Sequence, residues 1–332
     1  FYGRYKHAMY NTAKIAYVTD LHLCGRPSRI GSFVRRIDQL RDNGIRMLVN
    51  GGDMFDLSGD MWKPNGLVDM PKGIDQRIIY MEHSRDLAEG SMPEMIRHME
   101  GFDAFYSILG NADWLAAPWM CPQEDITGLR VFSPLRSPGF NGRLSFFLGG
   151  ASYNPLLVSG ISSIPALPHD EGALQLLYNN PWYGGVLHTE DYMARLNDPS
   201  LFSDGRTILI THMPALGAMD SFFHTKKQLL VENQGSPDLY AAIREHYPIL
   251  HLTGHVHDAP MATGSYRPFV VSNDSRTVTV NPGGGDLHDK ETEGISGVKI
   301  AVIDPFKLID LRDSGRLTEE TIQAERAVEI LR

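Results

Sequence analysis

Eight consecutive residues set a pattern that recurs along the chain: Ile15-Ala16-Tyr17-Val18-Thr19-Asp20-Leu21-His22. The β-branched and aromatic run predicts a buried strand, because short continuous apolar runs are typical of strands covered on both faces. A carboxylate and an imidazole follow this strand, two positions apart. Residues i and i+2 of an extended chain point to the same side, so both side chains can reach one site.

Four later apolar runs also end in polar ligand-type residues. They are residues 46–49 before Gly51-Gly52-Asp53, 104–109 before Gly110-Asn111-Ala112-Asp113, 207–210 before Thr211-His212, and 248–252 before Thr253-Gly254-His255-Val256-His257. Helical periodicity between the early strands predicts helices over residues 30–43 and from Ser236 onward, so the chain is expected to form a layered α/β fold. The ends of such strands meet at one crevice, where oxygen and nitrogen donors would converge.

The rest of the chain predicts one large domain. A length of 332 residues alone favours about two domains, but no break in composition marks a second one. We therefore expect a single domain over residues 1–332, with insertions near 57–100 and 162–203. The late apolar runs 269–271, 277–280 and 298–303 are close in sequence and predict a mostly antiparallel closing sheet.

Composition excludes several classes of protein. The formal charge of −9 lacks the positive field on which general binding to nucleic acids or anionic membranes depends. Two cysteines cannot form a disulfide framework, and no apolar run reaches the roughly 18 residues of a membrane helix. We expect a cytoplasmic protein that binds neither membranes nor extended nucleic acid; the sequence does not indicate its oligomeric state.

The motif series resembles that of the calcineurin-like metallophosphoesterases, from about residue 14 to residue 303. The resemblance implies a four-layer α/β/β/α sandwich around two mixed β-sheets, with a dinuclear metal centre. By motif, one metal would be held by Asp20, His22 and His257 and the other by Asn111, His212 and His255, with Asp53 bridging both.

This ligand set defines the expected cofactor and reaction. Mixed imidazole, carboxylate and amide ligation suits Mn, Fe, Zn, Co or Ni, of which Mn is favoured, better than Ca. A metal-bridging hydroxide would attack phosphorus, since divalent metals lower the pKa of bound water toward about 7. The expected catalytic residues are Asp53, Asn111 and His212, with Asp113 beside them, and the expected substrate is a small phosphodiester or a nucleotide.

The chain departs from the family at Ala112, where family members commonly carry a histidine that Asp113 orients. Three interpretations follow. In the first, the protein is an active phosphodiesterase in which the metals or a good leaving group make the histidine unnecessary. In the second, the imidazole of His188, His224 or His288 replaces the missing one. In the third, the chain binds metal and a phosphorylated ligand without turnover. Asp113 would then either support catalysis or cap the following helix. A phosphomonoesterase or a nuclease is a further alternative.

Overall fold

The computed structural model describes residues 14–23, 27–54, 97–98, 101–108, 110, 144–146, 149–153, 156–161, 164–165, 186–187, 189–203, 205–224, 229–263, 266–284 and 298–331. The strands are β1 Ile15–Val18, β2 Met47–Asn50, β3 Ala104–Ser107, β4 Leu144–Phe146, β5 Gly149–Tyr153, β6 Leu156–Ile161, β7 Ile164–Pro165, β8 Val186–Leu187, β9 Thr207–Thr211, β10 Phe222–His224, β11 Leu229–Val231, β12 Leu250–Thr253, β13 Phe269–Val271, β14 Val278–Val280, β15 Ile300–Ile303 and β16 Val328–Leu331. The helices are α2 Pro27–Asp42, α6 Thr189–Leu196, the 3₁₀ turn η3 Pro199–Leu201, α7 Pro237–His246, α8 Ala259–Ala262, α9 Pro305–Asp313 and α10 Glu319–Ala324.

Two large mixed sheets form the centre of the fold. The first has the strand order β16-β15-β1-β2-β3-β4, and the second has the order β13-β14-β12-β9-β6-β5. In each sheet the middle strands are parallel, whereas β15 and β16 in the first and β5 and β13 in the second pair antiparallel. In the sequence, the predicted site residues follow five of the parallel strands, namely β1, β2, β3, β9 and β12.

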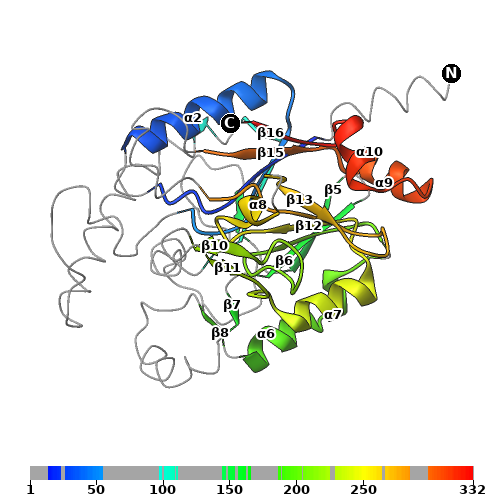
Figure 1. Cartoon of the computed structure of the whole chain (residues 1–332). Coiled ribbons are helices and arrows are strands. Elements are labelled where there is room, and N and C mark those ends of the chain that lie inside the picture. Colours follow the sequence, from blue (N-terminus) through cyan, green and yellow to red (C-terminus); the bar gives the residue numbers. More distant parts are fainter. Residues whose placement is uncertain are drawn as a thin grey trace, which may run out of the picture.

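Helices cover both outer faces, which gives the four layers that the family resemblance implies (Figure 1). Helix α2 lies outside the first sheet, and α6 and α7 lie outside the second. Apolar residues of α2 recur at helical spacing and are buried, namely Ile30, Phe33, Val34, Ile37 and Leu40. The largest apolar cluster among the described residues joins both sheets, for example through Val49 of β2 and Ile210 of β9, so a core lies between the sheets.

Local signals explain the helix boundaries. The Ser236 hydroxyl accepts a hydrogen bond from the Leu239 amide, and Pro237 begins α7, as the sequence predicts. Gly44 has a φ of +83° just after α2, which suits its predicted place at the helix end. No helix in the described ranges is long and apolar enough to cross a membrane.

The prediction of a closing sheet from the late strands is wrong. Strands β13 and β14 do form an antiparallel hairpin, but β14 also pairs parallel with β12 in the second sheet. Strand β15 belongs to the first sheet, where it pairs antiparallel with β1. The apolar pattern marks these segments as strands correctly, but it carries no information about which distant strand each one joins.

The two predicted insertions differ in what the structure describes. Apart from residues 97–98, the range 57–100 lies outside the described residues. The range 162–203 contains α6, whose Tyr192 and Leu196 pack with Leu239 and Ile243 of α7. This part of the range therefore belongs to the outer helical layer of the second sheet.

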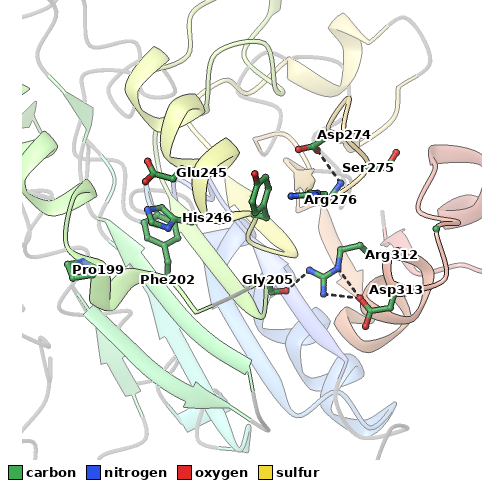
Figure 2. Close-up of a pocket in the computed structure, with 12 residues that line it drawn as sticks. Pro199, Phe202, Gly205, Glu245, His246, Asp274, Ser275, Arg276, Arg312 and Asp313 are labelled. Atoms are coloured by element: carbon green, nitrogen blue, oxygen red, sulfur yellow. Dashed lines mark hydrogen bonds and ion pairs between the residues drawn. The ribbon is translucent and has the colours of Figure 1, made fainter.

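A cavity of about 790 Å³ lies near the starts of β9, β12 and β14 (Figure 2). Its lining includes Arg312, which donates to the Gly205 carbonyl and pairs with Asp313, and Arg276, whose guanidinium lies 4.2 Å from the Tyr247 ring centroid. Predicted site residues follow the other ends of β9 and β12, and none of those that the structure describes lines this cavity.

Candidate metal centre

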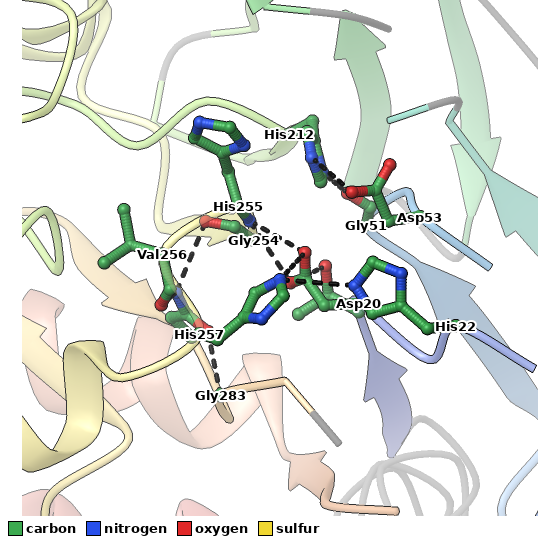
Figure 3. Close-up of polar contacts among 12 residues, drawn as sticks. Asp20, His22, Gly51, Asp53, His212, Gly254, His255, Val256, His257 and Gly283 are labelled. Atoms are coloured by element: carbon green, nitrogen blue, oxygen red, sulfur yellow. Dashed lines mark hydrogen bonds and ion pairs between the residues drawn. The ribbon is translucent and has the colours of Figure 1, made fainter. Parts of the chain in front are cut away.

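Four strand ends bring the predicted donors together where the two sheets meet (Figure 3). Strands β1 and β2 of the first sheet lead into Asp20 and Asp53, and strands β9 and β12 of the second lead into His212 and His255. The loops are joined by backbone hydrogen bonds, in which Asp20 N donates to Gly52 O and Gly254 N donates to His212 O. Residues more than 200 positions apart in sequence thus share one site.

The first donor group consists of Asp20, His22 and His257, whose ligand atoms all lie within 4.8 Å of one another. Asp20 Oδ1 is 3.2 Å from His257 Nε2, and His22 Nε2 is 3.3 Å from the same nitrogen. Asp20 and His22 are buried, and His257 is 31% exposed. The group therefore has one side open to solvent.

The second donor group consists of Asp20, Asp53 and His212, also within 4.8 Å. Asp53 Oδ2 is 3.3 Å from His212 Nε2, and both side chains are buried. Asp20 belongs to both groups, whereas the family resemblance assigns the bridging role to Asp53. The two groups nevertheless adjoin, which provides donors for two ions side by side.

His255 occupies a different position from the other three histidines. Its backbone amide donates to both carboxylate oxygens of Asp20, at 3.1 and 3.2 Å. Its ring lies beside that of His212, with 5.2 Å between centroids, but it belongs to neither three-residue donor group. The structure thus places His255 next to the second group and gives its backbone a role in holding Asp20.

The chemistry of the donor atoms fits metal ions. Because the Gly51 carbonyl can only accept, His212 Nδ1 donates its proton there at 2.9 Å. A neutral His212 then presents the lone pair of Nε2 to the Asp53 carboxylate, and this contact is favourable only with a proton or a cation between the two atoms. A ligand histidine whose second nitrogen donates to a carbonyl is the usual arrangement at metal sites.

The pKa values show how strongly these groups interact. Burial opposes the charge of His212, but the adjacent Asp53 carboxylate prevails and raises the pKa of His212 to about 9. Burial also opposes ionisation of Asp53, yet His212 and then His22 lower the pKa of that carboxyl. The pKa of His255 falls to about 4, through burial and then the repulsion of His212. Asp53 thus interacts with one histidine of each group.

At two glycines the backbone lies too close to these side chains to leave room for a Cβ atom. A Cβ atom on Gly52, whose φ is +101°, would lie 2.7 Å from His212 Nδ1. A Cβ atom on Gly110 would lie 2.1 Å from Asp53 Oδ1. Only glycine permits such contact, which explains why glycines precede the donors in the sequence.

Several predicted residues cannot be placed. Asn111, Ala112 and Asp113 lie outside the described residues, as do His188 and His288, and the side chain of His224 is not described. The substitution at Ala112 therefore remains an observation on the sequence.

The sequence did not identify three residues that support the donors. The Thr19 hydroxyl donates to Asp20 Oδ2 at 2.8 Å, Asn281 contacts the loop that carries His255 and His257, and His251 joins Thr211 to Thr279. A signal exists for His251, because it is a lone polar residue in the apolar run 248–252. Thr19 has no distinguishing signal beyond its place before Asp20.

A two-sheet α/β sandwich that collects imidazoles and carboxylates at its strand ends belongs to the class of metal-centred α/β proteins. A family model described as calcineurin-like phosphoesterase matches residues 13–259, so the chain belongs to the calcineurin-like phosphoesterase family. This membership confirms the family and the fold predicted from the sequence. It also supports metal-dependent hydrolysis of phosphoesters.

Several solved structures are similar to this chain, and the one with a TM-score above 0.5 supports the fold. One crystal structure matches with a TM-score of 0.52 and 13% identity, over 89% of this chain and 95% of the other. A dimetal phosphatase from Danio rerio matches with a TM-score of 0.45 and 10% identity, over 88% of this chain and 95% of the other. A purple acid phosphatase from yellow lupin (Lupinus luteus) seeds matches with a TM-score of 0.40 and 12% identity, over 87% of this chain and 50% of the other. The search of curated proteins found no match.

Proposed function

We propose that this protein is a phosphodiesterase that hydrolyses a small phosphodiester or a nucleotide. It would use two divalent transition-metal ions as cofactors, and we favour Mn²⁺ for both. The observation that carries the proposal is the pair of adjoining donor groups built on Asp20. The donors are nitrogen and oxygen atoms only, which is the ligand chemistry of Mn, Fe, Co, Ni or Zn rather than of Ca.

In this proposal Asp20, His22 and His257 hold one ion, and His212, His255 and Asn111 hold the other, with Asp53 shared. The electrostatic effect of His212 and His22 on Asp53 supports its shared position. Bound there, two such ions would lower the pKa of a coordinated water and polarise the phosphoryl oxygens of the substrate.

The protein's own groups orient the donors. The Gly51 carbonyl fixes the tautomer of His212, so that Nε2 faces the centre. The Thr19 hydroxyl and the His255 amide both donate to Asp20, which restricts the rotation of that carboxylate. These contacts would hold the donors in place before substrate arrives.

Charge and the residue at position 112 favour a diester. Two divalent ions outweigh the two carboxylates Asp20 and Asp53, so a crevice in an acidic protein becomes positive locally and suits a phosphodiester monoanion. Ala112 offers no proton to a leaving group, and general acid help is typically worth about 10²–10⁴ in rate. We therefore expect activity on diesters with good leaving groups to exceed activity on monoesters.

A metal-reconstituted assay tests this proposal. The chelated protein is loaded with Mn, Fe, Co, Ni or Zn and offered bis-p-nitrophenyl phosphate, p-nitrophenyl phosphate, cyclic nucleotides and nucleotides. We expect turnover of the diester with Mn²⁺, and loss of it in Asp53→Asn with retained fold. Metal binding without turnover on any ester would instead identify a non-catalytic metal- and phospho-ligand-binding protein.

The variant Ala112→His tests the interpretation of position 112. If a leaving-group acid is missing there, the new imidazole raises kcat for alkyl phosphodiesters more than for bis-p-nitrophenyl phosphate, because p-nitrophenolate leaves without a proton. Equal changes for both leaving groups would rule out that role. Ala112→Asn serves as the control, since it adds a polar side chain without a titrating proton.

We also propose a cytoplasmic location and a small phosphorylated ligand as the binding partner. The support is compositional: two cysteines suit a reducing compartment, and the charge of −9 disfavours a long polyanion.

A further inference from the structure

We propose that Asn281 is a positioning residue of the metal centre, whose side-chain amide fixes the turn that carries His255 and His257. This role rests on the proposed function, since it concerns two of the proposed ligands. Asn281 follows β14, is fully buried, and touches neither histidine ring in any described contact.

The contacts of Asn281 bracket His255. Its Nδ2 group donates to the Val256 carbonyl at 3.0 Å and to the Gly254 carbonyl at 3.4 Å. The Gly254 carbonyl belongs to the peptide bond that precedes His255, and the Val256 carbonyl belongs to the peptide bond that precedes His257. One amide group therefore holds the peptide planes before both histidines, and with them the directions of the two Cα–Cβ bonds.

The acceptor end of the same amide secures the opposite side. Asn281 Oδ1 accepts from the Gly283 amide at 2.8 Å, and Gly284 N donates to the His257 carbonyl at 3.3 Å. A Cβ atom on Gly284 would lie 2.8 Å from His257 Cγ, so the backbone at Gly284 packs against that ring. Figure 3 shows the neighbouring Gly283 beside His257. Asn281 thus joins the turn to the segment that supports it.

This arrangement needs an amide. The turn presents two carbonyl oxygens and the segment presents an N–H, so the side chain must offer donors at one end and an acceptor at the other. Both ends are used, which leaves no polar atom of Asn281 for binding substrate. An aspartate has the same shape but would place a carboxylate oxygen against two carbonyl oxygens.

The test compares Asn281→Asp with the wild type and with Asn273→Asp, which makes the same change at an exposed turn position. Hydrogen exchange of the metal-free proteins is followed over residues 254–258, with residues 249–253 as an internal reference. We expect about fivefold faster exchange over 254–258 in Asn281→Asp alone, since an intramolecular hydrogen bond is typically worth about 1 kcal/mol. Asn281→Ser, which lacks the opposed charge, serves if the aspartate variant does not fold.

Metal binding provides the second measurement. Co²⁺ titration followed by its visible absorption is expected to give an affinity about 10–100-fold weaker for Asn281→Asp than for Asn273→Asp, as is typical for residues that orient metal ligands. Unchanged exchange and unchanged Co²⁺ affinity in a folded Asn281 variant would overturn the positioning role. A wild-type protein that binds no Co²⁺ would refute the proposed function, while the exchange measurement would still decide whether Asn281 fixes the turn.

Discussion

At the scale of single residues, the donors combine strained backbone with close glycine contacts. Asp20, His22, Asp53 and His255 have φ values of 52°, 45°, 51° and 64°, in the left-handed region that side chains rarely adopt. Such residues cost about 1–3 kcal/mol each and persist where the surroundings hold them. Four such residues at one site lower the stability of the fold and at the same time orient the donors, a combination that is typical of functional sites.

The contact of Gly254 with Asp20 gives a prediction at this scale. An alanine Cβ there would lie 2.1 Å from Thr19 Oγ1 and 2.7 Å from Asp20 Oδ2, so both side chains must move. We expect Gly254→Ala to lower the free energy of unfolding by about 1–3 kcal/mol, as overpacking does, and to weaken metal binding. Urea unfolding and Co²⁺ titration measure the two effects.

Gly31→Ala is the matched control for this prediction. Its Cβ would meet only Arg35 Nη1 at 3.8 Å, inside helix α2, so the change should stabilise the protein by about 0.5–1 kcal/mol. Equal stability of Gly254→Ala and the wild type, with unchanged metal affinity, would contradict the close contact.

At the scale of elements, strand β12 carries a buried histidine that the site does not use as a donor. The Thr211 hydroxyl donates to the Met213 carbonyl, so it must accept from His251 Nε2, which leaves Nδ1 to accept from the Thr279 hydroxyl. His251 is therefore neutral and joins β9, β12 and β14 just before their loops. Burial lowers the pKa of His251 to about 3.

This histidine should make the protein less stable in acid. The unfolded chain binds a proton at His251 as the pH falls below about 6.5, whereas the folded protein does not do so until about pH 3. Between these limits the free energy of unfolding decreases as the pH decreases. His251 alone accounts for a loss of about 2 kcal/mol from pH 7 to pH 5. Urea unfolding at both pH values should show a loss that is about 2 kcal/mol larger in the wild type than in His251→Gln, which keeps a donor and an acceptor. The same pH dependence in both proteins would show that folding does not lower the pKa of His251.

The elements also show what sequence patterns can determine. Strands β1, β2, β9 and β12 were predicted because each is a short apolar run that ends in polar donors. Strand β15 was recognised as a strand but assigned to the wrong sheet, since its partner β1 lies more than 280 residues away and local alternation does not encode partners. The sequence did not identify Asn281, because its role depends on carbonyls of a distant turn.

At the scale of the whole molecule, the donors come from both sheets. Asp20, His22 and Asp53 belong to loops of the first sheet, and His212, His255 and His257 belong to loops of the second. Ions bound by both sets would link the sheets at this edge of the core. The unfolded chain lacks the assembled site, so metal binding should stabilise the folded state by mass action.

We therefore expect removal of metal to lower the melting temperature. Two sites, each at 100 times its Kd, contribute about 5 kcal/mol, and for a chain of this length that corresponds to roughly 5–10 °C. Calorimetry of the chelated protein and of the protein with excess Mn²⁺ measures the shift. Asp20 belongs to both donor groups, so Asp20→Asn should abolish most of the shift, whereas His22→Gln should abolish about half of it because it affects only the first group. A melting temperature that does not respond to Mn²⁺, Co²⁺ or Zn²⁺ in the wild type would mean that these side chains hold no metal, and that only the apolar core and the hydrogen bonds between the loops join the two sheets.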